Sequence, residues 1–145
     1  MDIDNAARTI PDGIGDPRQR VIDIVESFPE GVALPVAGLH LSLEVRGKRF
    51  GWFMENHHGD ERLVINCKAH PGMGQVMVEA NADVYHIPKM AKNRGWGLGI
   101  WLDVPGVNWG EIRNLLFDAY EIVSAKALKG KRKNGLDSNS RTAKF

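Results

Sequence analysis

The spacing of hydrophobic residues predicts a helix near each end of the chain. Val21, Ile24, Val25 and Phe28 recur at helical intervals after Asp16-Pro17, a pair typical of a helix start. This pattern predicts a first helix over residues 17–28. A second helix is predicted over 109–128, capped by Asn108 and ending at Gly130. Its apolar stripe consists of Ile112, Leu115, Leu116, Ala119, Ile122 and Val123.

Alternation of apolar and polar residues predicts strands between these helices. The predicted strands cover 39–45, 49–55, 63–67 and 96–103, with a short helix over 71–82 before the last one. The first three are separated by short turns and are expected to form an antiparallel meander. One shared interior is expected to bury Phe50, Trp52, Leu98, Ile100, Ile112 and Leu116.

The last predicted strand has an unusual second face. Trp101 points away from Leu98 and Ile100, and Gly97 and Gly99 flank it on the same side. We expect Phe53 and Val64 to join it over Gly51, because glycine lets a partner approach the backbone. Such a surface suits a stacked base, a small ligand or a protein. The alternative is that residues 71–96 cover it as a second small core.

Composition and charge predict one ordinary globular domain with a basic end. The 145 residues are 43% hydrophobic and 26% charged. Residues 126–145 hold seven Lys or Arg against one acid, a net charge of +6, whereas residues 1–125 carry −5. We therefore expect a flexible arm over 1–15, a domain over 16–129 and a flexible basic tail over 130–145. An acidic body argues against a broad DNA-binding face, but the tail could anchor nucleic acid.

The chain has no long apolar run, and its first residues are acidic, which predicts a cytoplasmic protein without a membrane partner. The single cysteine, Cys67, is expected to be a small core residue. His57 and His58, near Asp60 and Glu61, could ligate a metal, but adjacent loop histidines usually point apart. The glycine-rich segment 95–99 lacks the lysine of a phosphate loop. We therefore predict no cofactor, no metal, no catalytic residues and no enzyme activity.

Several short segments, taken in order, carry a family resemblance. Phe28-Pro29-Glu30-Gly31-Val32, Val45-Arg46-Gly47-Lys48-Arg49-Phe50, Arg94-Gly95-Trp96, Leu102-Asp103, Val107-Asn108-Trp109 and Ala119-Tyr120 together resemble the MmcQ/YjbR family over about residues 17–128. The resemblance implies a CyaY-like α+β fold, a two-layer sandwich with the N- and C-terminal helices on one face of an antiparallel sheet. Members are described as DNA-binding because the fold looks like the "double wing" domain of a phage transcription factor, which is an analogy of fold.

Together these observations predict an intracellular binding protein whose favoured partner is DNA, with a small-ligand or protein-interaction module on the Trp101 and Phe53 face as the alternative. Basic residues around that face and in the tail complete the predicted binding set. The set comprises Arg46, Lys48, Arg49, Phe53, Arg62, Lys68, Lys89, Lys92, Arg94, Trp101, Lys129, Lys131, Arg132 and Lys133.

Overall fold

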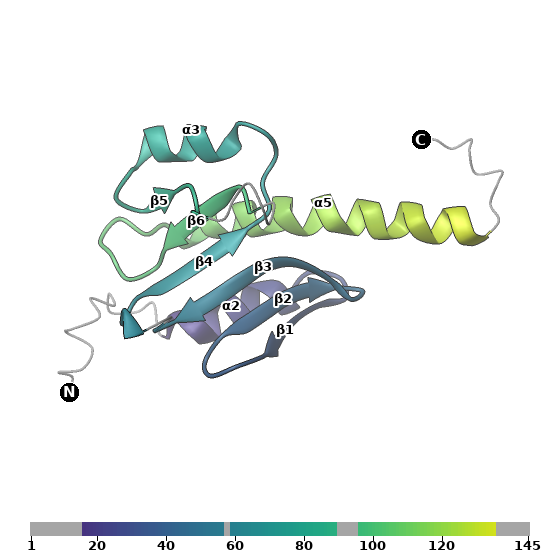
Figure 1. Ribbon diagram of the computed structural model, residues 1–145, viewed down its shortest axis with the longest axis horizontal. Coiled ribbons are helices and arrows are strands. Elements are labelled where there is room, and N and C mark those ends of the chain that lie inside the picture. Colours follow the sequence, from purple (N-terminus) through teal and green to yellow (C-terminus); the bar gives the residue numbers. More distant parts are fainter. Residues whose placement is uncertain (1–15, 57–58, 90–95, 136–145) are drawn as a thin grey trace.

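The computed structural model describes residues 16–56, 59–89 and 96–135, with side chains up to residue 125. Figure 1 shows an α+β protein in which a twisted antiparallel sheet packs against helices, as predicted. The elements in chain order are α2 (Pro17–Glu26), β1 (Gly31–Pro35), β2 (Leu41–Val45), β3 (Lys48–Glu55), β4 (Leu63–Cys67), α3 (Met73–Ala80), β5 (Tyr85–His86), β6 (Leu98–Trp101) and α5 (Trp109–Gly135).

The sheet has the strand order β1-β2-β3-β4-β6-β5, and each neighbouring pair is antiparallel. Helices α2 and α5 lie on one of its faces, which confirms the predicted two-layer arrangement, and α3 lies beside β5 (Figure 1). Cross-strand partners point to the same side, so the register assigns each side chain to a face. The face under α2 and α5, called the core face below, includes Leu41, Leu43, Ile65, Cys67, Leu98 and Ile100, all fully buried.

Both long helices begin where their sequences predict. The Asp16 carboxylate accepts a hydrogen bond from the Arg18 backbone N–H at 3.2 Å, and Pro17 occupies the first turn. The Asn108 side chain accepts from the Glu111 N–H at 3.0 Å. Helix α5 then continues through Gly130 to Gly135, so the predicted stop at Gly130 is wrong. A single glycine costs a helix only about 1 kcal/mol, too little to end a long run of good helix formers.

One local irregularity overturns part of the predicted core. Leu43 pairs with Gly51 but its neighbour Glu44 pairs with Arg49, so Phe50 is an extra residue, a β-bulge. The bulge shifts the alternation by one position, and Phe50 and Phe53 both face the core with no exposed surface. Trp52 and Met54 consequently face the other way and are partly exposed. The predictions that Trp52 packs inside and that Phe53 points outward are both wrong.

Two strands have no counterpart among the predicted elements. β1 forms one edge of the sheet, and β5, only two residues long, forms the other. Leu39, expected to start a buried strand, precedes β2 and is 51% exposed. The predicted arm over 1–15 lies outside the described residues. Among the described helices, none is both long enough and apolar enough to cross a membrane.

Candidate functional site on the outer face of the sheet

The face of the sheet opposite α2 and α5, called the outer face below, combines aromatic, cationic and polar side chains. Trp52, Asn66 and Gly99 are consecutive partners across β3, β4 and β6, and His86 of β5 pairs with Gly99. Met54, Val64 and Trp101 form the next row. On the other side, Leu34 pairs with Ser42 and Val32 with Glu44, which itself pairs with Arg49. These residues define the candidate site.

At the centre of the outer face, Arg49 stacks on Trp52. The guanidinium carbon lies 4.0 Å from the centroid of the indole, within range of a cation–π contact. Its Nε donates to the Ser42 hydroxyl at 2.7 Å, and that hydroxyl donates to the Glu44 carboxylate at 2.6 Å. Among the described residues no carboxylate lies within ion-pair distance of Arg49. The remaining guanidinium nitrogens can therefore contact an anion.

Trp101 is held more firmly. Its indole stacks with the His86 imidazole at a centroid distance of 4.5 Å and an interplanar angle of 25°. The Arg62 guanidinium carbon lies 3.9 Å from its centroid. Trp101 is thus partly exposed but packed against two planar groups, one of them from residues 71–96, the segment that covers this face in the alternative prediction. The predicted open indole is instead part of a three-residue stack.

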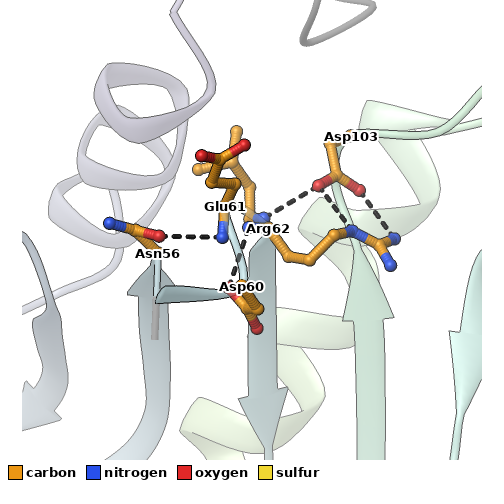
Figure 2. A network of polar contacts seen from close by, with 6 residues as sticks. Asn56, Asp60, Glu61, Arg62 and Asp103 are labelled. Atoms are coloured by element: carbon orange, nitrogen blue, oxygen red, sulfur yellow. Dashed lines mark hydrogen bonds and ion pairs between the residues drawn. The ribbon is translucent and has the colours of Figure 1, made fainter. Parts of the chain in front are cut away.

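Asp103 fixes the position of Arg62 (Figure 2). Two hydrogen bonds of 2.9 Å join the guanidinium to the carboxylate, and the Leu63 N–H donates to the same carboxylate at 2.9 Å. Burial alone would raise the pKa of Asp103, but these hydrogen bonds and the positive charge of Arg62 outweigh it and lower the pKa. Because the Arg62 guanidinium is held by Asp103 and also packs on Trp101, it acts as a fixed planar cation.

The loop before β4 supports the same arginine. Figure 2 shows the Asp60 carboxylate accepting from the Arg62 backbone N–H and the Asn56 side chain accepting from the Glu61 N–H, both at 2.8 Å. Asn56 and Glu61 both have positive φ, which places them in the left-handed region. Polar side chains that bond nearby backbone compensate for such strained positions. The chain therefore enters β4 in a defined conformation.

The His86 ring occupies the space that Gly99 leaves open. A Cβ atom on Gly99 would lie 2.3 Å from His86 Nε2, so a larger residue at position 99 would displace the imidazole. Burial, together with the nearby charge of Arg62, lowers the pKa of His86 and favours the neutral ring. Its buried Nδ1 atom has no hydrogen-bond partner, and neither does the buried Oδ1 of Asn66, on the far side of Gly99. This row thus contains two unsatisfied polar atoms.

The glycines were expected to admit an external partner, and this is wrong. Gly99 is covered by His86, and a Cβ on Gly97 would meet Ala69 at 3.1 Å. Gly51 lies on the core face, where a Cβ would contact Leu43 and Cys67. At all three positions, the space left by the missing side chain is filled by other residues of the protein.

Other members of the predicted binding set are dispersed. Arg46 lies on the helix side, 3.4 Å from Glu30 and 3.5 Å from the Ser124 hydroxyl. Lys68 contacts Trp96, with its Nζ 5.0 Å from the ring centroid. Lys48 and Lys89 are exposed. Lys92 and Arg94 lie outside the described residues, as do the side chains of Lys129, Lys131, Arg132 and Lys133, whose backbone belongs to α5. Of the members whose side chains the structure describes, Arg49, Arg62 and Trp101 lie on the outer face, in two separate stacks.

Sequence reasoning missed Trp52, Asn66 and His86. The bulge in β3 reversed the predicted direction of Trp52. Asn66 was missed because β4 was interpreted only as a half-buried strand. A signal for the bulge was present: Gly51 interrupts a strand whose residues Phe50, Trp52, Phe53 and Met54 are apolar on both sides. His86 lies in a strand too short to show alternation.

Other candidate chemistry finds little support. Burial raises the pKa of the Cys67 thiol to about 12, so the thiol stays protonated in the core, as its sequence context predicts. No group of three or more potential metal ligands occurs among the described residues. His57 and His58, the centre of the weighed metal cluster, lie outside those residues.

Comparison with known proteins agrees with the resemblance noted in the sequence. Neither a curated protein nor a solved structure matches the chain. A family model described as YjbR matches residues 25–122, which include the complete sheet, α3, the end of α2 and the first half of α5. The match covers more than half of the chain, and the chain therefore belongs to the YjbR family.

Proposed function

We propose that this protein binds single-stranded nucleic acid, DNA in the first instance, on the outer face of the sheet. The observation that carries the proposal is the stack of Arg49 on Trp52. A base can stack on a guanidinium plane as well as on an aromatic ring, and the same cation attracts phosphate, so this pair supplies both components of a single-strand platform. The Trp101 stack lies two strands away on the same face, and its indole is already engaged by His86 and Arg62.

The chemistry favours an unpaired strand over a duplex. Bases within a duplex are already stacked on one another, so an indole on a sheet gains access only to bases that are unpaired. Duplex binding depends mainly on many phosphate contacts, whereas Arg62 is neutralised by Asp103 and residues 1–125 carry a net −5. The proposal therefore predicts that the outer face itself makes few phosphate contacts.

The proposal is one of binding in an intracellular setting, without catalysis. Stacked planar side chains with polar neighbours can position a ligand, but they do not make or break bonds. The basic continuation of α5, which extends well beyond the sheet in Figure 1, is a further place where phosphates could be attracted. The fold analogy with a DNA-binding domain points the same way but concerns the fold only.

Titration of the full chain with short fluorescent single strands and duplexes tests the proposal. Trp52→Ala is expected to weaken single-strand binding by about 1–3 kcal/mol, the usual contribution of a stacked base. Arg49→Ala should reduce the salt slope by about one. Arg113→Ala is the matched control, because Arg113 also lies over an aromatic ring, Phe28, but on the helix side. Absence of single-strand binding by the wild type, or full binding by Trp52→Ala, would contradict the proposal.

A second candidate function, protein recognition, is favoured by an exposed apolar strip at the β1 edge. Val32, Leu34, Val36 and Leu39 are between 37% and 51% exposed, and residues 31–39 contain no charged side chain. Strand addition at this edge is hindered, because Pro35 lacks an N–H and the Gly31 N–H already donates to Phe28. A partner would therefore pack on the side chains. Loss of a captured partner with Leu34→Lys, but not with Trp52→Ala, would favour this function.

A further inference from the structure

Asn66 occupies the position on the outer face where a bound base would be recognised. Its register partners are Trp52 on one side and Gly99 on the other, so it lies between the Arg49–Trp52 pair and the Trp101 stack. A base on the Arg49–Trp52 pair would have one edge near β4, since neighbouring strands are only about 5 Å apart. Asn66 is the polar side chain of β4 on this face next to Trp52.

The hydrogen-bonding state of Asn66 is unusual for a residue in the middle of a sheet. Its Oδ1 atom is buried without a hydrogen-bond partner, although buried polar atoms in folded proteins are nearly always paired. His86 Nδ1, across Gly99, is in the same condition. An apolar residue in place of Asn66 would avoid this penalty, so packing within the protein does not explain the amide. Two unsatisfied polar atoms in one row indicate a group that arrives from outside.

We infer that Asn66 reads an adenine-type edge, a heterocycle that carries an amino group beside a ring nitrogen. A carboxamide presents an acceptor and a donor side by side, and adenine offers the complementary pair through its N6 amino group and N7. Rotation of the amide about χ2, a soft torsion in asparagine, turns Oδ1 outward to the amino group and lets Nδ2 donate to N7. Asn66 is thus a specificity-determining residue. This inference rests on the proposed function.

The test compares strands that differ by single atoms or groups. Oligo(dA), the same strand with purine in place of adenine, and the strand with 7-deazaadenine are titrated against the full chain by fluorescence anisotropy. Purine lacks only the amino group, and 7-deazaadenine lacks only the N7 acceptor. The wild type is expected to bind each analogue on the order of tenfold more weakly than oligo(dA). Asn66→Ala should bind all three strands alike, whereas Gln75→Ala, which removes an exposed amide from α3, should behave as wild type.

The outcomes separate the inference from the proposed function. Equal binding of the three strands by the wild type, or an unchanged preference in Asn66→Ala, overturns the role of Asn66 while single-strand binding stands. Free AMP is tested as a competitor. If it competes as well as oligo(dA) at equal nucleotide concentration, recognition of adenine stands, but the ligand is a nucleotide and not a strand. If Asn66→Ala fails to fold, Asn66→Ser supplies the same comparison, because serine cannot make the paired contact.

Discussion

Trp52 and Trp101 lie on the same sheet face, two strands apart, and yet their surroundings differ. Trp101 stacks on His86 and on an Arg62 that is itself bound to Asp103, so its neighbours form a closed arrangement. Trp52 stacks on Arg49, which has no direct carboxylate partner among the described residues and an exposed side chain. Similar aromatic–cation pairs can therefore serve different ends. The Trp101 pair is enclosed by its neighbours, and the Trp52 pair keeps an exposed arginine, as the proposed binding requires.

Among the changes that test the contrast between Trp52 and Trp101, Trp101→Ala is expected to have the largest effect on stability. This change removes the surface on which both His86 and Arg62 pack, and we expect a loss of about 3 kcal/mol in the free energy of unfolding, near the lower end for a buried tryptophan because Trp101 is partly exposed. Urea denaturation monitored by circular dichroism measures it. A loss below about 1 kcal/mol would mean that the stack does not stabilise the fold and that Trp101 is an open platform after all.

Asp103→Ala is expected to rank second, at about 2 kcal/mol. Removing one member of a buried ion pair typically costs more, but the Arg62 side chain is 38% exposed and water partly replaces the lost carboxylate. The variant also deprives the Leu63 N–H of its acceptor. Asp103→Asn, which keeps an acceptor for that N–H, is the matched control and should lose less. Equal stability of Asp103→Ala and wild type in denaturant melts would contradict the assigned role of the pair.

Sequence reasoning succeeded where the signal is local and failed where it depends on register. The helix start at Asp16-Pro17, the meander of β2 to β4 and the direction of Trp101 follow from neighbouring residues or from simple alternation. The exchange of Trp52 and Phe53 follows from one bulged residue, Phe50, and a shift of one position reverses every later side chain of the strand. One of the six predicted core residues, Trp52, and one predicted site residue, Phe53, were therefore wrong together, whereas the other five predicted core residues are buried.

The partners of the site residues were beyond sequence reasoning for another reason. Arg62 and Asp103 are 41 positions apart, and His86 reaches Trp101 only because the two-residue strand β5 pairs with β6. No periodic pattern reports such contacts, since they depend on how distant strands are aligned. The sequence provided the residue types for a stacking surface but not which tryptophan is engaged and which is available.

Trp52→Ala is expected to change stability by about 1 kcal/mol, much less than Trp101→Ala. The lost interactions are a cation–π contact with an exposed arginine, usually about 0.5–1 kcal/mol, and partial burial of one ring. The same urea melts give the value, with Trp101→Ala measured in parallel. A loss of 3 kcal/mol or more would show that Trp52 is as structural as Trp101, and the contrast between the two residues would disappear.

The smallest expected effect concerns pH and belongs to the Trp101 side alone. The folded protein lowers the pKa of His86 below its ordinary value of 6.5, mainly by burial and additionally through Arg62, so the unfolded chain binds this proton more readily than the folded protein does. Stability should therefore fall as the pH decreases from 6.5 towards the lowered pKa, and level off below it.

His86→Phe keeps a ring against Trp101 but cannot titrate, so its stability should depend less on pH in that window. Arg49→Ala, on the Trp52 side, should retain the wild-type dependence. Thermal melts between about pH 5 and 7 distinguish these cases, and identical pH profiles for wild type and His86→Phe would remove His86 from the closed arrangement around Trp101.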